Sequence, residues 1–238
     1  MQNRYAGDIG DYGKLGLLRS LSRTGLSIGV NWYLTPDEHH NGDGRFTAYL
    51  LDDSYRSLDE ELFFSLQKIV STDNRSVSAL EQAGLLEAAF YHEPLDFRGA
   101  ADRVAVRGRW HSEALGCLAG RDLVFLDPDN GLMVKSAERT IRANKYVTLK
   151  EIADYCRNGT SVIWYQHKAR EKNLFYSNQF REICEKPEFR GMTGLGLKFV
   201  PVSQRYYFFL IRPEHREFLS GWAETFLNSP WKSCFSIL

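Results

Sequence analysis

Unbroken apolar runs recur along this 238-residue chain, and most are bounded by glycine, proline or polar residues. Such runs are typical of strands that are buried on both faces of a sheet. They predict strands at residues 27–34, 46–51, 88–92, 122–126 and 160–165. A sheet built from these strands needs helices on both faces, because neither face is polar enough to meet water.

Between these runs, apolar residues recur every three or four positions, which is the spacing of one helix face. Leu17, Leu18 and Leu21 share one face of a first helix, for which Asp11 is the expected N-cap. Residues 96–109 are interpreted as a charged connection. The same spacing predicts further helices at residues 58–70, 76–87, 110–118, 148–157 and 171–184.

Two apolar runs near the end of the chain, residues 197–202 and 205–211, are separated by only two residues. This short link predicts an antiparallel hairpin. Alternating strands and helices predict an α/β fold, namely a doubly wound, mostly parallel sheet of about seven strands that this hairpin closes. We expect a single domain over residues 1–238, in which residues 1–24 form an N-terminal glycine-rich loop and helix.

The strand at residues 122–126 ends in an unusual polar sequence, Asp127-Pro128-Asp129-Asn130-Gly131. Pro128 cannot donate a hydrogen bond to a neighbouring strand, so the strand stops there. Open α/β sheets bind ligands outside the carboxyl ends of their strands. Asp127, Asp129 and Asn130 are therefore candidate catalytic residues, and the alternative is that Asp127 only caps the following turn.

A second polar cluster, Gln166-His167-Lys168-Ala169-Arg170, follows the strand at residues 160–165. Parallel strands bring their carboxyl ends to one edge of the sheet. His167 is thus a candidate general base or phosphate contact near Asp127. A surface or packing role for His167 has about equal weight.

The N-terminal segment has three glycines and two acids before its helix. A glycine-rich loop at a helix N-terminus brings backbone close to a ligand, so Gly7, Asp11 and Lys14 are candidate cofactor contacts. A packed N-terminal arm is the alternative. Asp37 and Glu38, just past the end of the first strand, are candidate ligand contacts as well.

Composition adds few constraints. The chain has 30 Lys and Arg against 30 Asp and Glu, so charge does not indicate nucleic-acid binding. Nucleic acid could still bind to a local basic patch, for which the candidates are Arg107, Arg109, Lys168 and Arg170. Four scattered cysteines lack metal-binding spacing, and no apolar run suits a signal peptide or a membrane span. We expect a cytoplasmic protein without a membrane partner; the oligomeric state is not predicted.

The order of elements resembles class I S-adenosylmethionine-dependent methyltransferases, whose seventh strand is antiparallel. Asp127-Pro128-Asp129-Asn130 stands where amino-methyltransferases of that fold have a D-P-P-Y type motif. A nearer resemblance is to the J family of large-subunit ribosomal RNA adenine N6-methyltransferases. It is carried by Ala6-Gly7, Asp11 and Lys14, by the apolar strand that enters Asp127-Pro128, and by Trp164-Tyr165 at the end of the following strand. Residues 3–14 and 126–131 also resemble a motif pair of a bacterial family without an assigned reaction.

This resemblance implies a transferase that uses S-adenosylmethionine to methylate an exocyclic amine of a nucleic-acid base. Asp127 would accept a hydrogen bond from the amine, while Asp11 and Lys14 would line the cofactor pocket. Asp37 or Glu38 would approach the ribose or amino-acid end of the cofactor. The aromatic residue of the D-P-P-Y motif, which stacks on the base, is replaced here by Asn130.

Two other interpretations remain open. In the first, Asp127 and Asp129 bind Mg²⁺ in a nuclease or phosphoesterase, because Mg²⁺ prefers oxygen ligands. The phosphate would then be contacted by Lys14, His167, Lys168 and Arg170. In the second, the chain is a binding protein that keeps the fold without catalysis.

Overall fold

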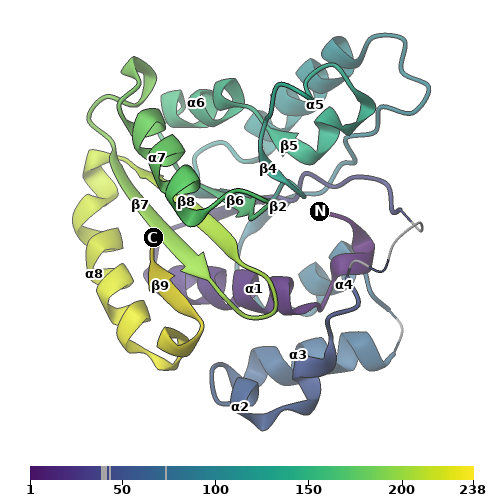
Figure 1. Ribbon diagram of the computed structural model, residues 1–238, viewed down its shortest axis with the longest axis vertical. Helices are drawn as coiled ribbons and strands as arrows, with labels where there is room; N and C mark the ends of the chain where they lie inside the picture. The colour runs from purple at the N-terminus through teal and green to yellow at the C-terminus, as the bar shows by residue number, and fades with distance from the viewer. Residues whose placement is uncertain (39–41, 43, 73) are drawn as a thin grey trace.

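The computed structural model describes residues 1–38, 42, 44–72 and 74–238 of the chain (Figure 1). Its centre is a seven-stranded sheet in the order β2-β1-β3-β6-β8-β7-β9. In that order the strands are β2 (Ala89–Tyr91), β1 (Ile28–Asn31), β3 (Leu123–Leu126), β6 (Ser161–His167), β8 (Arg205–Ile211), β7 (Thr193–Phe199) and β9 (Phe235–Ile237). A separate pair, β4 (Gly131–Leu132) and β5 (Tyr146–Val147), is parallel.

The sheet is mostly parallel, as expected. Strand β1 pairs in parallel with β2 and β3, and β3 pairs in parallel with β6. Strand β8 runs antiparallel between β6 and β7, and β9 runs antiparallel to β7. Five of the seven strands therefore point in one direction. Because β9 pairs with the far side of β7, the sheet extends beyond the predicted hairpin.

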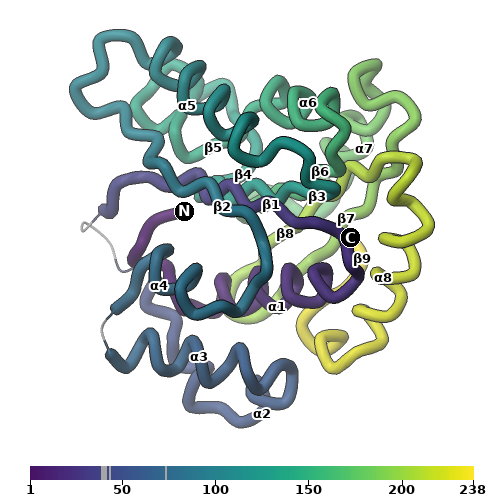
Figure 2. The backbone as a smooth tube through the Cα atoms, turned by 180° about the vertical axis from the view of Figure 1, so that it is seen from behind, coloured from purple at the N-terminus to yellow at the C-terminus, as the bar shows by residue number. Residues whose placement is uncertain are grey.

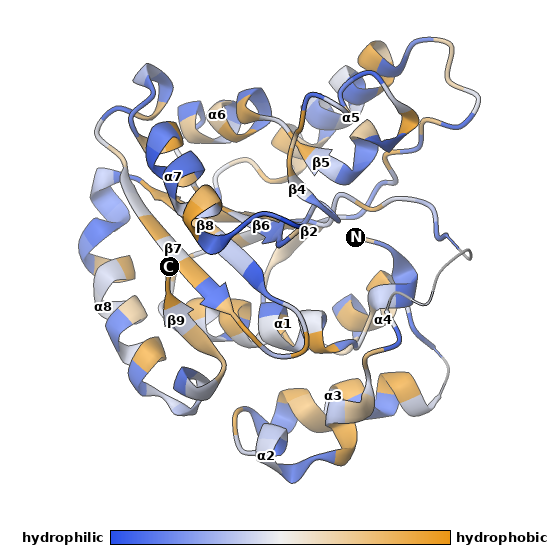
Figure 3. Ribbon diagram, in the orientation of Figure 1, coloured by the Kyte–Doolittle hydropathy of each residue, from blue (hydrophilic) through white to orange (hydrophobic). Residues whose placement is uncertain are grey.

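Helices cover both faces of the sheet, as Figures 1 and 2 show. They are α1 (Ile9–Ser22), α2 (Asp53–Arg56), α3 (Glu60–Ser71), α4 (Val77–Gln82), α5 (Arg103–Cys117), α6 (Leu149–Arg157), α7 (Asn173–Cys184) and α8 (Arg216–Asn228). One core cluster joins one face of the sheet to α1, α3, α4 and α8. The second joins the other face to α5, α6 and α7. In Figure 3 the strands of the sheet combine hydrophobic and more polar segments, and the helices are striped.

The structure corrects three sequence predictions. Residues 46–51 form no strand, because Ala48–Leu51 is a 3-10 helix in which Leu51 is 89% exposed. Part of the connection at 96–109 is helical, since α5 begins at Arg103 after an N-cap formed by Asp102. Helix α8 was not predicted, although Leu219, Trp222, Ala223 and Phe226 have helical spacing and are buried.

Candidate functional site

The candidate site lies where the path of the chain changes direction across the sheet. Strand β1 stands between β2 and β3, so the chain leaves β1 first to one side and later returns on the other. Such a switch point opens a crevice at the carboxyl ends of the strands, where α/β proteins bind ligands. Asp127 at the end of β3 is at this crevice, as its position in the sequence predicted.

Strand β3 determines the position of Asp127. All four residues of β3 are buried, and the backbone N–H of Asp127 donates to the Asn31 carbonyl at 2.9 Å, which extends the pairing with β1. The chain then turns, and Gly131 starts β4 with a φ of 103°. Gln166 on β6 secures this turn, because its Nε2 donates to the Asn130 carbonyl at 3.0 Å and its Oε1 accepts from Leu132 at 2.8 Å.

Lys14 on α1 links two of the predicted acids. Its Nζ lies 2.8 Å from Asp11 Oδ1 and 2.6 Å from Asp127 Oδ2. Lys14 and Asp127 are only 4% and 3% exposed. The N-terminal helix and the Asp-Pro-Asp-Asn turn, predicted separately, thus form one site.

The surroundings of this cluster shift its pKa values. Burial opposes the charged form of Lys14, but the carboxylates of Asp11 and Asp127 outweigh burial and raise the pKa of Lys14. Burial raises the pKa of the Asp127 carboxyl above its usual value, although Lys14 opposes this shift. Burial likewise raises the pKa of Asp11. The site therefore combines a firmly protonated lysine with carboxylates that hold protons more strongly than free aspartate does.

Asp8 and Gly7 shape the start of α1. Asp8 is the N-cap and the prediction of Asp11 was wrong, because Asp11 lies inside the first turn, where its N–H donates to Asp8 Oδ1 at 2.9 Å. The Gly7 N–H donates to Asp11 Oδ2 at 3.2 Å. Gly7 has a φ of 79°, and a Cβ there would lie 2.7 Å from Val70. In this structure Gly7 orients Asp11 and is absent from the pocket lining.

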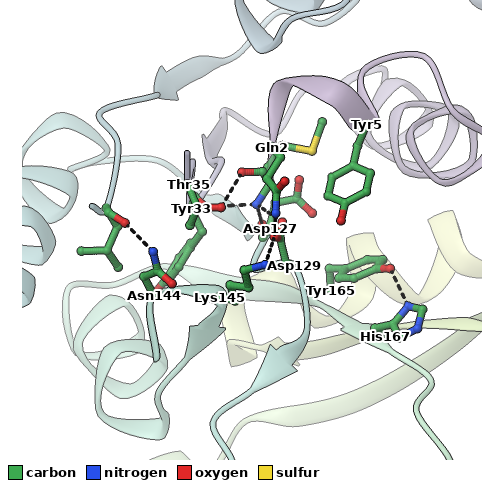
Figure 4. A network of polar contacts seen from close by, with 12 residues as sticks. Gln2, Tyr5, Tyr33, Thr35, Asp127, Asp129, Asn144, Lys145, Tyr165 and His167 are labelled. Atoms are coloured by element: carbon green, nitrogen blue, oxygen red, sulfur yellow. Dashed lines mark hydrogen bonds and ion pairs between the residues drawn. The ribbon is translucent and has the colours of Figure 1, made fainter. Parts of the chain in front are cut away.

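Asp129 faces the N-terminal segment. Its carboxylate lies 2.7 Å from the amino group of Met1 and accepts from Gln2 Nε2 at 2.8 Å. Burial would raise the pKa of Asp129, but these partners and Lys145 lower it below its usual value. Figure 4 shows this network beside Asp127.

Asp37 and Glu38 contact the same N-terminal segment. Asp37 Oδ1 accepts from the Arg4 N–H at 3.3 Å, and the Glu38 N–H donates to Gln2 Oε1 at 3.0 Å. The Glu38 carboxylate also forms an ion pair with Lys145 at 2.5 Å. Neither residue lines the pocket at Asp127. The loop that follows includes residues 39–41 and 43, which lie outside the described part of the chain.

A pocket of about 180 Å³ opens beside Asp127. It is smaller than the roughly 300–1,000 Å³ of sites that enclose drug-sized ligands, so it would enclose only the reacting groups of a larger ligand. Among the predicted residues, Asp127, Asp129 and Asn130 line it from the exit of β3, and His167 lines it from the end of β6. The lining is Met1, Tyr5, Asp8, Gly10, Asp11, Lys14, Gly44, Phe46, Asp127, Pro128, Asp129, Asn130, Tyr165, His167, Ser203 and Arg205.

Ten of the lining residues were not predicted as site residues, and those whose side chains are ionisable or phenolic are Tyr5, Asp8, Tyr165 and Arg205. Tyr165 OH lies 3.4 Å from His167 Nδ1, which places His167 at the pocket as predicted. Figure 4 shows Tyr5 reaching toward Tyr165 from the N-terminal segment. Asp8 shares the glycine-rich segment with Asp11, a signal that was available, whereas Arg205 was interpreted as structural.

The predicted basic patch is not assembled as expected. Arg107 is directed inward, where its Nε and Nη2 donate to the two Glu151 oxygens at 2.6 and 2.7 Å. Its charge is therefore neutralised. Arg109 is exposed on α5, while Lys168 and Arg170 follow β6 at the pocket side of the sheet.

Within the described residues, no three His, Cys, Asp or Glu side chains are grouped as metal ligands. No helix among these residues is long and apolar enough to cross a membrane. No protein-family model and no curated protein matches the sequence.

Proposed function

We propose that this protein is a methyltransferase that uses S-adenosylmethionine to methylate an exocyclic amine, with Asp127 holding the amine. One observation carries the proposal. Lys14 occupies Asp127 Oδ2, whereas Asp127 Oδ1 accepts no hydrogen bond from the residues that the structure describes, and Asp127 lines the pocket. Asp127 Oδ1 is not among the fully buried atoms that lack a partner, so an amine N–H of a substrate in the pocket can reach this free acceptor and donate to it.

Aromatic rings at the pocket support a nucleic-acid base as the carrier of the amine. Tyr5 and Tyr165 both line the pocket, from the N-terminal segment and from β6. A base stacked on aromatic side chains gains about 1–3 kcal/mol. These rings would replace the stacking residue that is absent at Asn130.

The residues present fit the charges of S-adenosylmethionine. Asp8 and Asp11 would face its cationic groups, and Arg205, which also lines the pocket, would pair with its carboxylate. When bound, this cofactor supplies an electrophilic methyl group. The other expected cofactor contacts, Gly7, Asp37 and Glu38, would have an indirect role. They would hold Asp11 and the N-terminal segment in position.

Asp127 would contribute in two ways. Its Oδ1 would orient the amine so that the nitrogen lone pair points to the methyl donor, and orientation of this kind is a major source of rate acceleration. It would also receive the proton that the amine loses, which its raised pKa favours. Lys14 would keep the other oxygen fixed during both steps.

The geometry favours this function over a Mg²⁺-dependent nuclease. Asp127 and Asp129 are each paired with a cation inside the protein. A divalent ion at Asp127 would have to displace the buried Lys14, which is held by two carboxylates. A Mg²⁺ ion bound to the Asp127 carboxylate would also be repelled by the Lys14 ammonium group that contacts the same carboxylate.

Calorimetric titration with S-adenosylmethionine tests the proposal. We expect saturable binding to the wild-type protein and to Asp53→Asn, a matched substitution at an exposed position on α2. Asp8→Asn keeps the size of the side chain but removes a charge that would face the cationic groups of the cofactor, and we expect weaker binding. The absence of binding at millimolar S-adenosylmethionine would rule out the proposed cofactor.

A further inference from the structure

A second pocket lies at the opposite edge of the sheet, at the amino ends of β1 and β2. Its volume is about 400 Å³, which is within the range of small-molecule sites. Figure 2 shows the segments that lead into these two strands. The pocket is lined by Ser22, Gly25, Leu26, Ser27, Ile28, Glu87, Ala88, Ala89 and Arg121. It shares no residue with the pocket at Asp127.

Arg121 is the distinctive member of this lining. Its Nε is buried and has no hydrogen-bond partner, and no described residue forms an ion pair with its guanidinium group. A buried donor without an acceptor is unfavourable by about 1–3 kcal/mol, and by more when the group is charged. Arg121 as a whole is partly exposed, so its guanidinium group offers N–H groups at the wall of the pocket that a ligand can reach.

The neighbouring acid does not fill this role. Asp122 Oδ2 accepts from the Ser27 N–H at 2.8 Å and from the Ser27 hydroxyl at 2.7 Å. Its Oδ1 is directed to His215, 3.7 Å from Nε2. Asp122 thus fastens β3 to β1. The hydrogen bonds from Ser27 contribute most to lowering the pKa of Asp122, and the charge of Arg121 makes only a minor contribution, with no hydrogen bond between the two side chains.

Packing holds Arg121 in place. A Cβ on Gly29 would lie 3.2 Å from Arg121 Cγ, so the aliphatic part of the arginine lies closely over β1. The Arg121 carbonyl accepts from Thr160 Oγ1 at 3.1 Å. A fixed guanidinium group loses little freedom when it binds, and its planar fork matches the two oxygens of a carboxylate or phosphate.

We infer that this pocket is a binding site for a small oxyanion, a carboxylate or a phosphate group, held by Arg121. The small residues of the wall, Gly25, Ser27, Ala88 and Ala89, give the ligand access to the guanidinium group. Glu87 is exposed on the same pocket and limits the charge of the ligand. A polyanion would be repelled, whereas a compact anion that carries an amine at its other end would pair with both side chains.

Titrations of the full-length protein followed by amide NMR test this site. Inorganic phosphate and acetate are added separately at constant ionic strength, so that the two oxyanion classes are distinguished. We expect saturable shifts at the amides of Gly25, Ser27, Ala88 and Ala89 with at least one anion. Arg121→Gln should weaken binding at least tenfold, and Glu87→Gln should strengthen it.

Two further variants keep the test decisive. If Arg121→Gln fails to fold, Arg121→Lys preserves the charge without the planar fork, and its weaker binding supports the inference. Asp127→Asn should bind the anion as tightly as wild type, because that residue belongs to the other pocket. The site is overturned if neither anion gives saturable shifts there, or if a folded Arg121 variant binds equally well.

Discussion

Replacement of Lys14 by methionine probes the centre of the candidate site. The substitution keeps most of the side-chain volume and removes the charge between Asp11 and Asp127. At an effective dielectric constant of about 20, contacts of 2.6 and 2.8 Å are each worth about 6 kcal/mol before desolvation. Desolvation of the buried lysine offsets much of this energy. Breaking a buried ion pair by removing one partner destabilises proteins by about 3–5 kcal/mol, which is the loss that we expect.

Urea unfolding at pH 7 measures this loss, with Lys150→Met as the matched control. Lys150 also contacts an aspartate, Asp154, at 3.0 Å, but its side chain is 78% exposed. An exposed pair of this kind contributes only about 0.2–1 kcal/mol. The two lysines thus differ in burial while the substitution is the same.

A double variant identifies the cause. If Lys14→Met destabilises by leaving Asp127 unpaired, then adding Asp127→Asn should restore part of the lost stability. The reasoning is refuted if Lys14→Met destabilises no more than Lys150→Met. It is also refuted if the effects of the two site substitutions simply add.

Three further outcomes follow from the structure. Gly131→Ala should lose about 1–3 kcal/mol more stability than Gly120→Ala in thermal unfolding. Both glycines have a positive φ, but only a Cβ at Gly131 would clash, because it would lie 2.3 Å from Gln166 Oε1. Equal losses of stability in the two variants would contradict this prediction. Burial alone would raise the pKa of Glu151, but its ion pair with Arg107 lowers this pKa below the usual 4.5. Glu151 therefore stabilises the fold above about pH 4.5, and this stabilisation is lost as the pH falls through the pKa of the folded state. Glu151→Gln should flatten this part of the acid-unfolding curve. Tyr5→Leu should weaken binding of a nucleobase by about 1–3 kcal/mol in a fluorescence titration, and unchanged affinity would exclude stacking on Tyr5.

Strands that are buried on both faces were the most predictable part of the fold. Strands β1 and β3 lie inside their predicted ranges, and β6 begins inside its range at Ser161 but runs on to His167, past the predicted end at residue 165. The run at 46–51 has the same composition, but it has no neighbouring strand and leaves Leu51 in solvent. Apolar character alone does not separate these cases, because the presence of a pairing partner is a tertiary property.

Only part of the site could be predicted from the sequence. The strand-ending sequence identified Asp127, and the glycine-rich segment identified Lys14 and Asp11. The contact between Lys14 and Asp127 spans 113 positions and depends on how α1 packs, so no local pattern specifies it. Tyr5 reaches the pocket for the same reason, through the path of the N-terminal segment.

Detection of methyl transfer is the most direct test of the central claim. The protein is incubated with S-adenosylmethionine carrying a labelled methyl group and with single-stranded RNA and DNA, and the products are digested to nucleosides. We predict label on an exocyclic amine of one base with the wild-type protein and with Asp53→Asn, and a strongly reduced yield with Asp127→Asn. A label that Asp127→Asn incorporates at the wild-type rate, or no label on any nucleoside, would contradict the account.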